Sequence, residues 1–157
     1  MILVADSSAL IALSACDGIK LLEPLFSEVV VPLAVYQEVI KPEKPEAIPL
    51  QKYLKDKVVE VDMSHFVYLD AFADAGENEA MLLYKQKSAD KLLIDDKRGR
   101  KVAKINEIST IGSLGVLLTA KQKELIPEVK PYIDKINESR VFLSPSLVQM
   151  VLDIAKE

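Results

Sequence analysis

Short apolar runs without helical periodicity recur along the chain. The runs at residues 2–5, 29–31 and 92–94 contain only Ile, Leu, Val and Ala. Continuous apolar runs of this length are typical of strands that are buried on both faces, as in parallel sheets. Residues 58–61 predict an edge strand, and residues 108–111 predict a further strand. The sequence therefore predicts a central parallel sheet of about four to five strands.

Helical patterns separate these runs. We expect Ser7 or Ser8 to cap a helix that continues to the turn at Asp17–Gly18, and Pro32 to open the helix after the second strand. Further helices are predicted at residues 19–26, 33–40, 47–54, 64–73, 77–87, 97–106, 112–118, 127–137 and 144–156. Strands that alternate with helices predict an α/β fold, a three-layer α/β/α sandwich. No internal repeat is visible, so we expect a single domain over residues 1–157.

Composition excludes several classes of protein. Lys and Arg total 20 against 24 Asp and Glu, a formal net charge of −4, which excludes a strongly basic nucleic-acid coat protein. One Cys and one His exclude a disulfide framework, a Cys-rich zinc site and a His cluster, so any metal must be held by oxygen. No apolar run reaches about 18 residues and there is no basic leader, so we expect a cytoplasmic protein without membrane contact.

Acidic residues follow the predicted strands. In an open α/β sheet, ligands bind outside the carboxyl ends of the strands, and four chain segments bring acids toward that edge. These acids are Asp6, Glu38, Glu77, Glu79, Asp95 and Asp96. Clustered carboxylates oppose one another's ionisation, and a divalent cation relieves that conflict. Oxygen ligands favour Mg²⁺ or Mn²⁺, and two such ions support hydrolysis of a phosphodiester.

The same acids have purely structural alternatives. Asp6 and the pair Asp95–Asp96 could cap helices, and Glu77 and Glu79 could complement a helix dipole. The basic residues Lys97, Arg98, Arg100, Lys101 and Lys104 likewise form either a solvated helix face or a ridge that contacts phosphates.

The whole pattern resembles the PIN-domain nucleases, within them a toxin-like, DUF3368-like branch of prokaryotic and often archaeal proteins. The resemblance rests on the stretches MILVADSSALIALSACDGIKLLEPLF, VVVPLAVYQEV, AGENEAMLLY, LLIDDKRGRKVAK and TIGSLGVLLTAKQKELI, which cover nearly all of residues 1–140. It implies a metal-dependent ribonuclease, a small antitoxin as partner, and a homodimer. Many family members have Asp at the third acidic position, where this chain has Glu.

Carried onto this sequence, the resemblance implies a shared carboxylate site. Its acids would be Asp6, Glu38, either Glu77 or Glu79, and either Asp95 or Asp96, with Asp6, Glu77, Asp95 and Asp96 as the candidate ligands of Mg²⁺ or Mn²⁺. Substrate RNA would be bound by Ser7, Ser8, Lys97, Arg98 and Lys101.

Two other functions are weighed against the nuclease. A phosphoryl-transfer enzyme is disfavoured, because Ser8 stands where a haloacid-dehalogenase-like site has a second Asp and the chain contains no P-loop. A catalytically weak PIN-like module that binds RNA or protein stays open, because of the Glu at the third acidic position.

Overall fold

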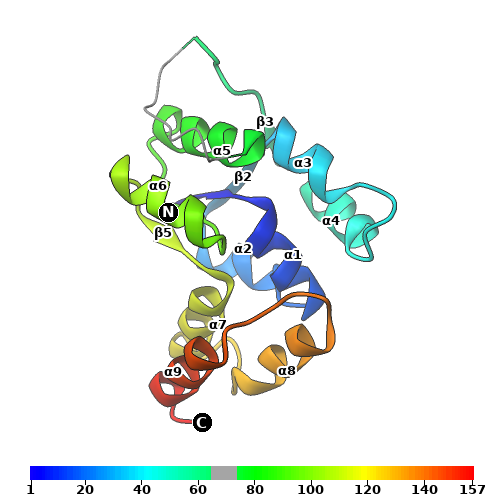
Figure 1. Ribbon diagram of the computed structural model, residues 1–157, viewed down its shortest axis with the longest axis vertical. Helices are drawn as coiled ribbons and strands as arrows, with labels where there is room; N and C mark the ends of the chain where they lie inside the picture. Colours follow the sequence, from blue (N-terminus) through cyan, green and yellow to red (C-terminus); the bar gives the residue numbers. More distant parts are fainter. Residues whose placement is uncertain (65–73) are drawn as a thin grey trace.

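A parallel sheet runs through the centre of the molecule (Figure 1). The computed structural model describes residues 1–64 and 74–157, and within them the sheet has five strands in the order β3-β2-β1-β4-β5. The strands are β1 (Ile2–Ala5), β2 (Glu28–Pro32), β3 (Val58–Val59), β4 (Lys91–Leu93) and β5 (Thr110–Ile111). Each predicted apolar run forms a strand, but the two edge strands β3 and β5 are only two residues long, shorter than predicted.

Alternate residues of the central strands face two separate cores. Leu3 and Leu93 pack in one core, while their neighbours Val4 and Leu92 pack in the other. The first core is covered by α1 (Ser7–Ala15), α2 (Leu22–Leu25), α3 (Leu33–Val39), α4 (Ala47–Leu54), α7 (Ser113–Gln122), α8 (Lys130–Glu138) and α9 (Pro145–Ala155). The second is covered by α5 (Ala75–Gln86) and α6 (Lys97–Ile105). The predicted three-layer α/β arrangement is confirmed.

Several details of the predicted helices are wrong, and among them α7 ends at Gln122 rather than at residue 118 and α8 begins at Lys130 rather than at residue 127. Asp6, not Ser7 or Ser8, is the N-cap of α1, because its carboxylate reaches the Ser8 amide while both serines already lie inside the helix. α5 begins at Ala75 rather than at residue 77, because Asp74 forms a capping box with Glu77. Residues 19–26 form a short 3₁₀ helix η1 (Ile19–Leu21) followed by α2. The helix predicted at 64–73 lies almost entirely outside the described residues.

The topology brings the ends of β1 and β4 together. β1 lies between β2 and β4, and Val4 is in register with Val30 on one side and Leu92 on the other. The chain leaves β1 toward one neighbour and returns on its other side, which is the switch point where ligands bind in open α/β sheets. The Asp6 amide donates to the Leu93 carbonyl at 2.8 Å, so the segments that follow β1 and β4 start side by side. No helix within residues 1–64 and 74–157 is both long and apolar enough to cross a membrane.

Candidate active site

Asp6 is a buried carboxylate with hydrogen-bond partners for only one of its two oxygens among the described residues. Its side chain is 2% exposed, and Oδ2 accepts hydrogen bonds from the Ser8 amide at 3.4 Å and the Ser8 hydroxyl at 3.1 Å. Oδ1 is buried without a hydrogen-bond partner among the described residues. Burial raises the pKa of Asp6 from 3.8 to about 6, although hydrogen bonds from Ser7 and Ser8 oppose the rise. A buried oxygen without a partner needs a proton or a cation.

Glu77 lies in the first turn of α5, near enough to Asp6 for the charge of Asp6 to raise its pKa. Its amide donates to Asp74 Oδ1 at 2.8 Å, and the Asp74 amide donates to Glu77 Oε2 at 3.3 Å. Glu77 is 6% exposed, and burial raises its pKa to about 7, with further contributions from the negative charges of Asp74, Asp6 and Asp96. These four acids, Asp6, Asp74, Glu77 and Asp96, are therefore close enough to repel one another, and we refer to them as the acidic group.

Asp96 and Gly99 connect the acidic group to α6. Asp96 caps that helix, because its Oδ2 accepts from the Gly99 amide at 2.7 Å. A Cβ atom on Gly99 would lie 3.0 Å from Glu77 Oε1, so the glycine lets the carboxylate approach the first turn of α6. The positive end of the helix dipole lies there and favours negative charge.

Gly99→Ala should therefore cost stability, whereas Gly76→Ala should not. A methyl group at position 99 would collide with Ile94 Cδ1, which is buried, and would crowd Glu77. We expect a loss of about 1–3 kcal/mol of unfolding free energy, as for other overpacked sites. At Gly76 the nearest atoms would be 3.4 Å away, an ordinary contact. Urea unfolding of both variants measures the difference, and equal stability would contradict the tight approach at Gly99.

Two of the predicted acids point elsewhere. Asp95 accepts from the Ser113 amide and hydroxyl, both at 2.7 Å, so its two oxygens serve the start of α7. Glu79 Oε2 accepts from the Ala34 amide at 3.3 Å, at the start of α3. The structure thus places Asp96 with Glu77, while Asp95 and Glu79 form contacts that support the fold.

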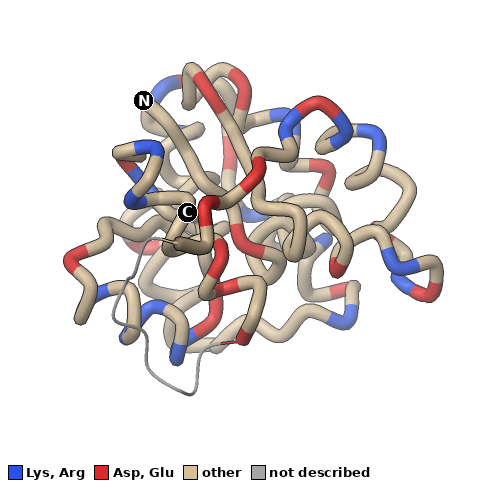
Figure 2. Tube along the Cα trace, turned by 90° about the horizontal axis from the view of Figure 1, so that it is seen from above, with Lys and Arg blue, Asp and Glu red and all other residues tan. Residues whose placement is uncertain are grey.

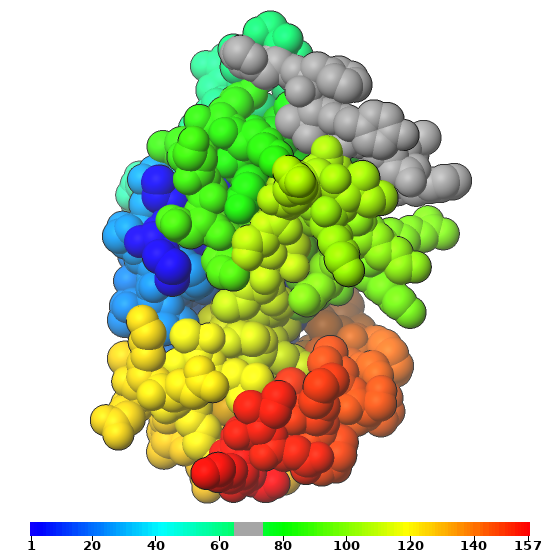
Figure 3. Space-filling view, turned by 90° about the vertical axis from the view of Figure 1, so that its left-hand side faces the viewer, coloured from blue at the N-terminus to red at the C-terminus, as the bar shows by residue number. Residues whose placement is uncertain are grey.

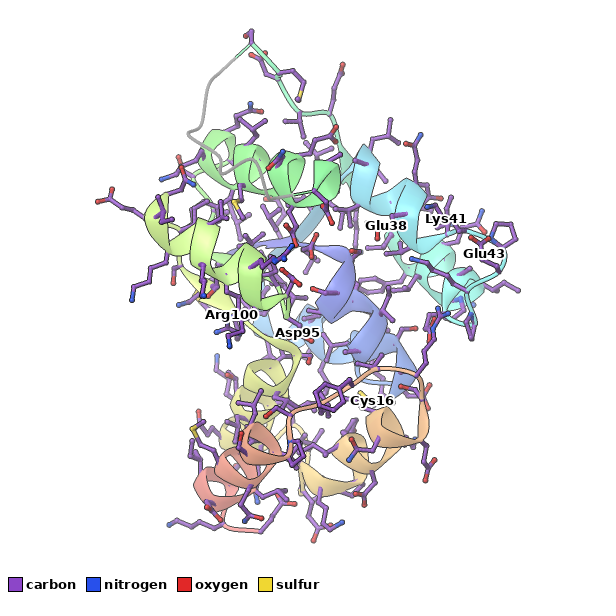
Figure 4. The ribbon with its side chains drawn as sticks, viewed as in Figure 1. Cys16, Glu38, Lys41, Glu43, Asp95 and Arg100 are labelled. Carbon is purple, nitrogen blue, oxygen red and sulfur yellow. The ribbon has the colours of Figure 1, made fainter. Side chains whose placement is uncertain are left out.

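Glu38 lies beside the acidic group, on α3. Its Oε2 would be 3.4 Å from a Cβ atom on Gly76, in the same helical turn as Glu77, and its Oε1 is 3.9 Å from Lys44 Nζ. Figure 4 shows Glu38 on one side of α1, with Asp95 and Arg100 on the other. Of the four predicted segments, three contribute to the acidic group and the fourth contributes Glu38 at its margin.

Comparison with known proteins agrees with this geometry. The family model DUF3368, described as a PIN domain, matches residues 2–157. The chain belongs to this PIN-domain family. The resemblance predicted from the sequence is thereby confirmed, and the fold is of a nuclease type. No curated protein matches the chain.

One acid of this PIN domain was missed in the sequence analysis. Asp74 belongs to the acidic group and contributes the largest repulsion acting on Glu77. The signal was present as Asp74-Ala75-Gly76-Glu77, an acidic N-cap followed three residues later by Glu, which is the pattern of a capping box.

The candidate metal ligands of this PIN domain have the chemistry that a hard divalent cation prefers. They are all carboxylate oxygens, and the buried Asp6 Oδ1 lacks a partner among the described residues. Within residues 1–64 and 74–157, no three acids are already gathered as a metal-binding set. A bound cation would therefore have to draw the side chains of the acidic group closer together, and its positive charge would offset their mutual repulsion.

The basic residues of α6 are free to bind an anion. Lys97, Arg98, Arg100, Lys101 and Lys104 are all exposed, and none forms an ion pair with any described residue. Figure 3 shows α6 on the surface beside α5, with side chains of its first turns projecting outward. In Figure 2 acidic positions occur through the middle of the trace, and most basic positions lie toward its outer turns. Ser7 is buried and Ser8 is half-buried, directly beside Asp6.

Proposed function

We propose that this PIN domain is a metal-dependent endoribonuclease that uses Mg²⁺ or Mn²⁺ to hydrolyse RNA phosphodiesters. The observation that supports the proposal is the buried Oδ1 of Asp6, which has no hydrogen-bond partner in the described part of the chain and lies at the carboxyl edge of the sheet among further carboxylates. Oxygen-only donors at the switch point of an open sheet are suited to a phosphoryl-transfer site.

We assign the residues of the acidic group separate roles. Asp6, Glu77 and Asp96 would hold the cation, with Glu38 and Asp74 at the margin. When bound, the cation supplies positive charge that stabilises the negative charge developing on the phosphate and the leaving oxygen. Water attacks phosphorus and the bond to the 3′ oxygen breaks, which leaves a 3′-hydroxyl and a 5′-phosphate. Asp95 and Glu79 support the site by fixing the starts of α7 and α3.

The remaining predicted residues would bind substrate. Lys97, Arg98 and Lys101 on α6 offer free charges for RNA phosphates, which positions a strand without reading its sequence. Ser8 holds both Asp6 and the Asp95 amide, at 3.1 and 3.0 Å, so it fixes β1 against β4 at the site. With Ser7 it lies where the scissile phosphate would enter.

The biological setting is proposed from the family. We infer that the protein acts as the toxin of a toxin–antitoxin pair, held inactive by a small antitoxin protein, and that it forms a homodimer in the cytoplasm. Co-expression with the neighbouring gene product, followed by purification of the complex, tests the partner.

A matched pair of variants on α5 tests the proposed site. We expect Glu77→Gln to lower metal-dependent cleavage of an end-labelled RNA pool by at least about 100-fold, because it removes a ligand charge. Glu79→Gln, two residues further along the helix, should change the rate by less than about threefold, because Glu79 faces Ala34. Parallel reactions with Mg²⁺, Mn²⁺ and EDTA show whether cleavage requires metal. A larger loss in Glu79→Gln would contradict the assignment.

A PIN-like binding module is the second candidate. It is favoured by one observation, namely that no three acids of the described residues are yet gathered around a cation position. Folded wild-type protein that binds RNA and Mn²⁺ but yields no cleavage products would support this function and exclude the nuclease.

A further inference from the structure

The loop between α3 and α4 places the positively charged side chain of Lys44 near Glu38, which lies beside the acidic group on the side away from α6. Lys44 Nζ lies 3.9 Å from Glu38 Oε1, and the Lys44 side chain is only 20% exposed. The other oxygen of Glu38 lies against Gly76, one residue before Glu77. Gly99 therefore lies against Glu77, the preceding residue Gly76 lies against Glu38, and Glu38 lies near Lys44.

The backbone around Lys44 is held in place. Its amide donates to the Lys41 carbonyl at 3.0 Å, and its carbonyl accepts from the Ala47 amide at 3.1 Å. Two residues later, the buried Glu46 forms an ion pair with Arg140 at 3.1 Å. Pro42 and Pro45 restrict the loop further. The position of Lys44 is thus built into the fold.

The contact with Glu38 leaves the Lys44 ammonium largely unused. A lysine carries three hydrogen-bond donors, and a separation of 3.9 Å is too long for a hydrogen bond. Among the described residues, the structure gives Lys44 Nζ no other acceptor. A lysine whose side chain is mostly buried, and whose ammonium has free donors at the margin of an acidic site, is suited to an anionic ligand such as a phosphate oxygen.

We propose that Lys44 binds a phosphate of the RNA strand on the side of the acids opposite α6. The strand would then cross the acidic group between two sets of cations, those of α6 and Lys44. Figure 4 shows this separation, with Arg100 on one side of α1 and Glu38 and Lys41, at the start of the loop, on the other. The inference rests on the proposed function, because it assumes that RNA binds at these acids.

Binding without cleavage tests the role of Lys44. We would measure the fluorescence anisotropy of a labelled, unstructured single-stranded RNA in EDTA over a series of KCl concentrations. Lys44→Met keeps the apolar stem and removes the charge. It should weaken binding several-fold and reduce the slope of log K against log[KCl] by about 0.7, the value for one phosphate contact on a single strand. Lys101→Ala should reduce the slope similarly. Lys123→Ala, at the end of α7 remote from Asp95, should not.

Glu38 allows a direct contact to be separated from simple charge neutralisation. If Lys44 only screens Glu38, Lys44→Met should have no effect on the slope in a Glu38→Gln background. If Lys44 contacts phosphate, the slope should fall by about 0.7 in both backgrounds. An unchanged slope in either background, together with a reduced slope in Lys101→Ala, would overturn the role of Lys44 and leave the nuclease intact. Wild-type protein that binds no RNA in EDTA would overturn the role of Lys44, whereas the nuclease itself is tested separately by the cleavage assay with Mg²⁺ or Mn²⁺. Thermal melts establish that each variant is folded.

Discussion

Asp6→Asn is expected to abolish RNA cleavage and to leave the fold intact. Asn is as good an N-cap as Asp, so the start of α1 and the bonds to Ser8 should persist. The change removes the negative charge from the only candidate ligand that is both fully buried and lacks a partner for one oxygen within the described chain. We expect a loss of at least about 100-fold in cleavage rate, equivalent to about 2.7 kcal/mol of transition-state stabilisation.

A control at the other end of α1 makes this result interpretable. Asp17 is exposed and pairs with Lys135 at 3.2 Å, remote from β4. Asp17→Asn removes the same charge from the turn that follows α1, and the variant should cleave RNA like the wild type. Equal cleavage by Asp6→Asn and wild type, purified identically, would indicate a contaminating nuclease and would remove Asp6 from the proposed site.

Asp6→Asn is also expected to stabilise the folded protein when no metal is present. Burial raises the pKa of Asp6 from 3.8 to about 6, so the folded state disfavours the ionised carboxylate. Below pH 3.8 Asp6 is protonated in both the folded and the unfolded chain, and its titration costs nothing. Between pH 3.8 and 6 the unfolded chain ionises Asp6 while the folded state keeps it protonated, so the cost grows through this range. Above pH 6 it levels off at about 3 kcal/mol. Above pH 6, Asp6→Asn should therefore unfold at a higher temperature than wild type, by several degrees.

Differential scanning calorimetry in EDTA, at pH 4 and at pH 7.5, measures this effect. The advantage of Asp6→Asn should be present at pH 7.5 and close to zero at pH 4. Added Mg²⁺ should raise the melting temperature of wild type but not that of the variant, because a ligand stabilises only the state that binds it. A variant less stable than wild type at pH 7.5 in EDTA would contradict the account of Asp6 as a destabilising buried charge.

The layers of the fold could be predicted because the three central strands are built around apolar runs. Leu3, Val31 and Leu93 are buried completely, and no polar residue interrupts their strands near the centre of the sheet. The helix starts were less accurate, because Asp, Ser and Thr are all good caps and adjacent candidates differ by a single hydrogen bond. At Asp6-Ser7-Ser8 that bond goes to Asp6.

The choice between neighbouring acids could not be made from the sequence. Asp95 and Asp96 both follow β4, yet one turns toward Ser113 and the other toward the start of α6. Glu77 and Glu79 are two residues apart on a helix, which places them about 200° apart around its axis. Which of the two faces Asp6 depends on how α5 packs on the sheet, and that is a long-range property. Asp74 could not be placed because Gly76 indicates a break before the helix, whereas in the structure it lies inside α5, whose N-cap is Asp74.

The two edge strands of the sheet, each two residues long, have a consequence for assembly. An edge strand recruits another extended chain through its free amides and carbonyls, and a two-residue edge offers very few of them. Within the described part of the chain, lengthening the sheet by β-augmentation is therefore disfavoured, as is edge-to-edge aggregation at high concentration. A partner protein would therefore find more contact surface on the helices and loops than on these edges, and an inhibitor designed as a β-strand mimic would find few backbone groups to pair with.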